Sequence, residues 1–79
     1  MDFGEALRAV KQGKKAARAV WTGGRHDWTG AHLELVHVQS PDGREVMPLL
    51  MIDYPERGIL RPFGGANWDL LADDWEIVG

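Results

Sequence analysis

The sequence contains no cysteine, which removes two common ways of stabilising a small protein. Without cysteine there are no disulfide bonds and no zinc sites built on thiolates. Long hydrophobic runs are also missing: the longest, residues 47–52, is far shorter than the roughly 20 residues of a membrane-spanning helix. We find no pattern typical of a signal peptide. We therefore expect a protein of the cytoplasm without a membrane partner.

Catalytic sequence motifs are absent as well. The sequence has no HExxH zinc motif, no GxSxG nucleophile turn and no phosphate-binding loop. His32 and His37 are five positions apart, which places them on opposite faces of a regular strand, where they cannot share a metal ion. We expect no enzyme activity, no cofactor and no metal site. A small phosphodiesterase built on His26 and Asp27 is the least favoured alternative.

Positive charge is scarce beyond the first third of the sequence. Residues 1–26 hold six basic and two acidic side chains, a net charge of +4. Residues 27–79 hold three basic and ten acidic side chains, a net charge of −7. Because proteins that bind DNA or RNA normally present a wide basic surface, this local patch favours a small anion as the ligand. In the alternative interpretation, Lys11, Lys14 and Lys15 only form a solvated turn.

Hydrophobic periodicity and turn residues predict an α+β fold in one domain, residues 1–79. A helix is expected from Asp2, with Glu5 completing a capping box, to a stop at Gly13. Strands are expected at residues 16–21, 32–39, 45–53, 59–63 and 75–78, and a short C-terminal helical turn at 69–73. Asn67 is a candidate cap for that turn, and Pro48 predicts an edge position or a bulge. Because short turns join consecutive strands, the sheet of about five strands should be mostly antiparallel.

Four tryptophans are hard to bury in a domain of 79 residues, so some of them should lie at a binding surface. Trp21 is the first candidate for stacking on a base, because small alanines precede it in the expected strand. Trp28 is a candidate contact because it lies in a glycine-rich loop, and loops lie at the surface. Two alternatives remain: the helix fills the space beside Trp21, and Trp28 folds back over the core. We assign Trp75 to the core, since apolar residues precede it.

Arg18 and Arg25 are candidate phosphate contacts, and Asn67 and Trp68 are candidate contacts to a base or ribose. Stacking a base on an aromatic ring contributes roughly 1–3 kcal/mol. A nanomolar complex needs about 12 kcal/mol beyond the costs of association. One small subunit with a single exposed ring falls short of this, so we expect a homo-oligomer with its sites between subunits.

Both ends of the sequence carry motifs. The chain begins with MDFGEAL at residues 1–7, KxGKK at 11–15 and RxxWTG at 18–23, and it ends with DLLADDWEI at 69–77. In this order and at this length, the motifs resemble the second Thoeris anti-defence family of phage proteins. The resemblance implies a homotetrameric sponge, which binds cyclic ADP-ribose-type or cyclic oligonucleotide immune signals between protomers without cleaving them. The alternative is an interaction module whose exposed tryptophans dock a host or virion protein.

One segment departs from the pattern of that family. Before the DLLA motif the family often has Trp-x-Pro-Ser, whereas residues 63–66 here are Phe-Gly-Gly-Ala, followed by Asn67 and Trp68. The serine that would cap the helical turn is absent. We expect ligand preference to differ at this segment.

Overall fold

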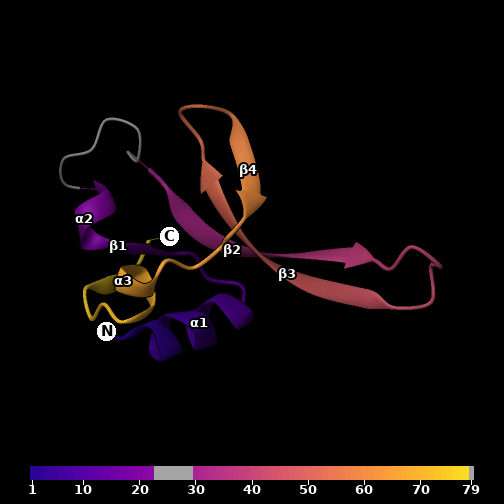
Figure 1. Cartoon of the computed structure of the whole chain (residues 1–79), viewed down its shortest axis with the longest axis horizontal. Helices are drawn as coiled ribbons and strands as arrows, with labels where there is room; N and C mark the ends of the chain where they lie inside the picture. Colours follow the sequence, from indigo (N-terminus) through magenta and orange to yellow (C-terminus); the bar gives the residue numbers. More distant parts are fainter. Residues whose placement is uncertain (23–29, 79) are drawn as a thin grey trace.

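The computed structural model describes residues 1–22 and 30–78. Within these residues the chain forms one antiparallel sheet of five strands, in the order β4-β3-β2-β1-β5 (Figure 1). The strands are β1 (Ala16–Arg18), β2 (His32–Gln39), β3 (Val46–Tyr54), β4 (Ile59–Pro62) and β5 (Trp75–Ile77). The helices are α1 (Phe3–Lys11), α2 (Ala19–Thr22) and α3 (Asn67–Leu70), and none in the described ranges is long and apolar enough to cross a membrane. The expected α+β fold, with its N-terminal helix and short C-terminal helical turn, is confirmed.

Helix α1 begins as the sequence predicts. The Asp2 carboxylate accepts a hydrogen bond from the Glu5 backbone N–H at 2.8 Å, which satisfies one of the unpaired donors of the first turn. Ala6 and Val10 are fully buried, so this face of the helix packs on the sheet. Gly13, with a φ of +92°, follows the helix in a conformation that other residues rarely adopt. The chain can therefore turn directly into β1.

An aromatic cluster fills the space between α1 and the sheet. The Trp75 ring centroid lies 5.3 Å from that of Phe3, 5.2 Å from that of Trp21 and 6.4 Å from that of Phe63. Tilted and edge-on ring pairs of this kind stabilise a core beyond the area that they bury. Trp75 is buried, and its indole N–H donates to the Asp69 backbone carbonyl at 2.9 Å. Its predicted assignment to the core is confirmed.

Strands β2 and β3 form a hairpin that projects from the rest of the molecule (Figure 1). Their register is continuous from His32 opposite Asp53 to Gln39 opposite Val46. Strand β4 pairs only with residues 51–54 of β3, and β1 is registered with β2 only at Leu33. The outer part is therefore a two-stranded arm in the described chain. Pro48 lies in this arm, where the missing backbone N–H costs no hydrogen bond to a third strand.

Two local predictions are wrong. The strand expected at residues 16–21 ends at Arg18, and residues 19–22 form the single turn of α2. Asp74 explains the change, because its carbonyl accepts from the Ala19 N–H at 3.0 Å and its carboxylate accepts from the Val20 N–H at 3.4 Å. The C-terminal helical turn lies at 67–70 rather than 69–73, so Asn67 is its first residue and Ala66 occupies the cap position without a side-chain bond.

Candidate functional site

A pocket of about 310 Å³ lies where β3 and β4 meet the glycine-rich segment before α3. Its lining residues come from these three parts: Ile52, Tyr54, Arg61, Pro62, Phe63, Gly64, Gly65, Ala66 and Asp69. This volume is at the lower end of the range for small-molecule sites. The pocket is therefore large enough to hold a small molecule or part of a larger one.

One side of the pocket presents a cation over an aromatic ring. The Arg61 guanidinium carbon lies 5.5 Å from the centroid of the Tyr54 ring. The two residues meet because β3 and β4 pair with Ile52 opposite Arg61 and Tyr54 opposite Ile59. Contact with a ring face favours the cation and restrains the long arginine side chain. Arg61 is exposed, so its N–H groups can reach an anionic ligand.

Gly65 gives the other side of the pocket its shape. Its φ is +69°, and an added Cβ would lie 3.3 Å from Leu70 Cδ2. The backbone conformation therefore favours glycine at this position, and a larger residue would also have to displace the Leu70 side chain slightly. The segment that departs from the family pattern thus forms a wall of the pocket and sets the start of α3.

Arg18 lies behind the pocket in a network with two aspartates. Its Nη1 donates to Asp69 Oδ1 at 2.8 Å, and its Nε donates to Asp74 Oδ1 at 2.8 Å. The Asp69 side chain is only 8% exposed and that of Asp74 is 29% exposed. The hydrogen bond that Arg18 donates to Asp74 is the main cause that raises the pKa of Arg18, and the same bond lowers the pKa of the Asp74 carboxyl. Arg18 therefore holds the C-terminal segment to β1, and two carboxylates already neutralise the charge that a phosphate contact would use.

Trp21 has its ring in the core of the chain. It is 3% exposed and packs edge-on against Trp75 and Phe63, with centroids 5.2 Å and 6.4 Å away. Phe63 lines the pocket, so Trp21 lies directly behind one pocket residue. Stacking of Trp21 on a base stays a prediction, and it would require the core to open.

The remaining predicted site residues fall into two groups. Asn67 and Trp68 lie on α3 next to the pocket residues Ala66 and Asp69, and Trp68 is 72% exposed. Arg25 and Trp28 lie outside the described residues, as do His26 and Asp27.

Sequence reasoning missed Tyr54 and Arg61, although both line the pocket. Pairing the predicted strand at 59–63 with the end of the strand at 45–53 would have brought them together, because the turn between the two strands is short.

Side chains that can bind a metal ion gather on the opposite face of the sheet. There His32, Glu34 and Asp53 place one ligand atom each within 4.8 Å of one another. The sequence analysis also missed this cluster, because Asp53 meets His32 only through the register of the hairpin.

Comparison with known proteins agrees with the resemblance of the two ends. The family model of the Tad2-like, or Thoeris anti-defense 2-like, domain matches residues 1–78. A search of curated proteins returned no match. The family match includes α1, the pocket and β5, and it supports a role in Thoeris anti-defence. The chain belongs to the Tad2-like (Thoeris anti-defense 2-like) family.

Proposed function

We propose that the protein binds a cyclic nucleotide immune signal of the cyclic ADP-ribose type and withholds it from its receptor without cleaving it. The observation that carries this proposal is the Tad2-like match over residues 1–78. Cyclic oligonucleotide signals are the related ligand class. In this proposal the protein acts in the cytoplasm of the host cell, where such signals are made.

The chemistry of the pocket supports this ligand class. A cyclic ADP-ribose carries a pyrophosphate, two riboses and an adenine. The exposed Arg61 supplies a cation for a phosphate, and the Tyr54 ring beside it supplies an aromatic surface. The Asp69 carboxylate lines the pocket and can accept a hydrogen bond from a hydroxyl or amino group. In this proposal these groups bind and orient a nucleotide, which is what sequestration of the signal requires.

Exposed apolar side chains support the second part of the proposal, a homotetramer with ligand sites between protomers. Trp68 is 72% exposed and Leu71 is 85% exposed, and Val20 on α2 is also exposed. Tryptophan is enriched at protein interfaces, and exposed apolar patches mark interaction sites. The two-stranded arm adds Val46 and Leu49, and an isolated hairpin of this kind is only marginally stable in water. A neighbouring copy that covers these surfaces would also supply a further wall of the pocket.

The test is retention of an intact ligand. The protein is incubated with a cyclic ADP-ribose isomer, passed through a desalting column and denatured by heat, and the released material is identified by mass spectrometry. Recovery of the intact molecule supports sequestration, whereas recovery of an opened product overturns it in favour of an enzyme. Native mass spectrometry of the same sample reports the number of chains and of ligands. A monomer with bound ligand would refute sites between protomers.

A matched pair of variants tests the pocket itself. Arg61→Gln removes the cation over Tyr54 and should lower the amount of retained ligand at least tenfold, since charge-assisted hydrogen bonds contribute about 1.5–3 kcal/mol. Arg44→Gln removes an exposed arginine from the turn of the hairpin and should leave retention unchanged. Equal loss in both variants would show that the ligand responds to net charge and not to this pocket.

The exposure of Trp68 also favours a second candidate, a module that docks a host or virion protein. The two functions differ in their response to nucleotides. A sequestering protein gains thermal stability when it binds its signal, by mass action. A docking module shows no thermal shift with any cyclic nucleotide and loses partner binding in Trp68→Ser.

A further inference from the structure

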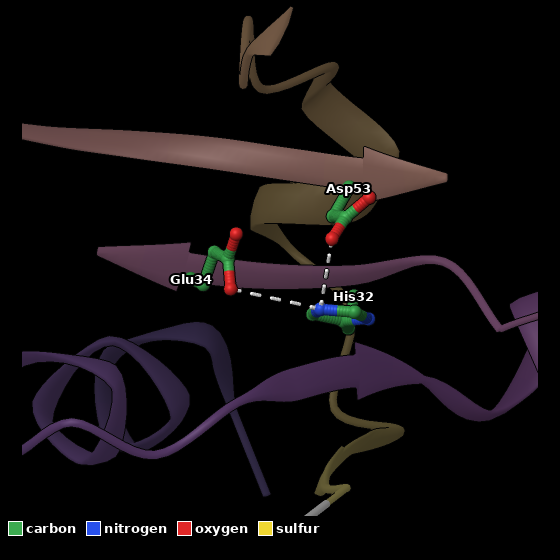
Figure 2. A group of neighbouring side chains, drawn as sticks. All are labelled: His32, Glu34 and Asp53. Carbon is green, nitrogen blue, oxygen red and sulfur yellow. Dashed lines mark ion pairs between the residues drawn. The ribbon is translucent and has the colours of Figure 1, made fainter. Parts of the chain in front are cut away.

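Three side chains that can bind a metal ion, from β2 and β3, point toward one another (Figure 2). His32 and Glu34 are two residues apart on β2, so they point to the same side. Asp53 on β3 is the cross-strand partner of His32. Because side chains alternate along a strand, Asp53 points away from the pocket that its neighbours Ile52 and Tyr54 line.

The hydrogen bond at Nδ1 of His32 defines which ring nitrogen carries the proton. His32 Nδ1 lies 2.9 Å from the Gly30 backbone oxygen, which can only accept, so Nδ1 carries the proton. In the neutral ring, Nε2 then has a lone pair to offer. Nε2 is buried, the residue is 9% exposed, and this nitrogen has no hydrogen-bond partner among the described residues.

The lone pair of Nε2 faces two carboxylates. The Nε2 atom lies 3.6 Å from Asp53 Oδ2 and 3.8 Å from Glu34 Oε2. Three electron-rich atoms at these distances repel one another unless a cation lies between them. We propose that His32 Nε2, Glu34 and Asp53 bind a divalent transition-metal ion, and that zinc is the ion that fits best.

The geometry favours zinc in particular. Zinc binds histidine nitrogen and carboxylate oxygen at about 2.0–2.2 Å, so ligand atoms around a tetrahedral ion are roughly 3.3 Å apart. The distances from Nε2 exceed this by only a few tenths of an ångström, and both carboxylates are partly exposed and can rotate inward. A zinc-binding histidine also usually donates its other N–H to a backbone carbonyl or carboxylate, as His32 does to Gly30. Mg²⁺ and Ca²⁺ prefer oxygen ligands alone.

The place of the site in the fold assigns it a structural role. The ion would join β2 to β3 in the part of the sheet where β3 also pairs with β4, and its fourth position would be taken by water. The three ligands come together only in the folded hairpin, so metal binding stabilises the folded state. The site lies on the other face of the sheet from the pocket between β3, β4 and the glycine-rich segment, and this inference does not depend on the proposed function.

The test is a titration of the full chain with zinc chloride after treatment with a chelator. We expect one zinc ion per chain. At free zinc 100-fold above the dissociation constant, the Tm should rise by roughly 10–20 °C. Magnesium chloride at the same concentration should give no shift. Cobalt chloride should give the visible absorption of a tetrahedral site with nitrogen and oxygen ligands.

Variants identify the ligands without disturbing the buried histidine. Asp53→Asn and Glu34→Gln keep the shape of each side chain and should each weaken zinc binding at least tenfold, with loss of the cobalt absorption. The matched control is His37→Asn, which removes an exposed histidine from the same strand and should leave zinc binding unchanged. Absence of saturable binding at millimolar zinc, or binding that survives Asp53→Asn, would overturn the proposal. So would nitrogen NMR that shows His32 protonated at both nitrogens and indifferent to zinc, because a proton would then be the cation between the carboxylates.

Discussion

Replacement of Arg18 by methionine should destabilise the protein in the absence of any ligand. Methionine keeps much of the aliphatic length but removes the donors that bind Asp69 and Asp74 at 2.8 Å each. The free energy of unfolding should fall even if Arg18 never touches a nucleotide. A loss of stability without ligand would show that Arg18 stabilises the fold, independently of the phosphate contact that the sequence predicts.

The magnitude follows from the exposure of the two partners. A hydrogen bond to a charged group contributes about 1.5–3 kcal/mol. The pair with Asp74, whose side chain is 29% exposed, is screened by water and counts for about 1 kcal/mol. The pair with Asp69, whose side chain is 8% exposed, counts nearly in full, because its charge would stay buried without a partner. The sum is about 3 kcal/mol, which lowers the Tm of a domain of this size by roughly 12–24 °C.

Urea denaturation followed by circular dichroism measures this loss. Arg8→Met, on the exposed side of α1, is the matched control and should change the free energy of unfolding by less than about 0.5 kcal/mol. Adding Asp69→Asn to Arg18→Met should restore part of the loss, because it removes the unpaired buried charge. A loss below about 0.5 kcal/mol in Arg18→Met would refute the reasoning. So would a double variant less stable than the single one.

Three further predictions concern pH, the core and the pocket wall. Because Arg18 lowers the pKa of Asp74, their pair stabilises the fold above the usual carboxyl pKa, and this stability is lost as the pH falls through the lowered value. Urea midpoints should therefore fall more steeply below about pH 4 in the wild type than in Arg18→Met. Trp21→Ala should lower the free energy of unfolding by about 3–5 kcal/mol, whereas a loss below 1 kcal/mol in urea denaturation would mean that the ring is not in the core. Gly65→Ala should cost about 1–2 kcal/mol in the same assay because its φ is +69°, and Gly64→Ala, where an added Cβ meets open space, should cost less.

Much of the sheet could be predicted from local patterns. The turn at residues 40–43 and the alternation on either side of it define the hairpin of β2 and β3, and Asp2 and Gly13 define the ends of α1. Each of these features depends on contacts between residues that are close in the sequence, so the local pattern is enough to predict it. For the same reason the expected strand ends differ from the observed ones by only a residue or so at most positions.

The parts that sequence reasoning missed depend on contacts between distant residues. The strand at Arg18 ends because Asp74, 56 positions further along, binds the backbone beyond it. Trp21 was expected to stack on a base because small alanines precede it in the expected strand. The helical turn α2 instead directs its ring into the core. The same holds for Arg61 over Tyr54, a contact that depends on strand register.

The pairing of the first strand with the last has a consequence for folding during synthesis. Strand β1 pairs through all three of its residues with β5, and the Met1 ammonium donates to the backbone carbonyls of Asp73 and Trp75. None of these partners exists until residues 73–77 have left the ribosome. Contacts so distant in sequence slow folding. The nascent chain should therefore expose its apolar residues to chaperones and proteases until residues 73–77 have emerged, and a chain truncated before Trp75 should be degraded rather than accumulate as a shorter folded protein.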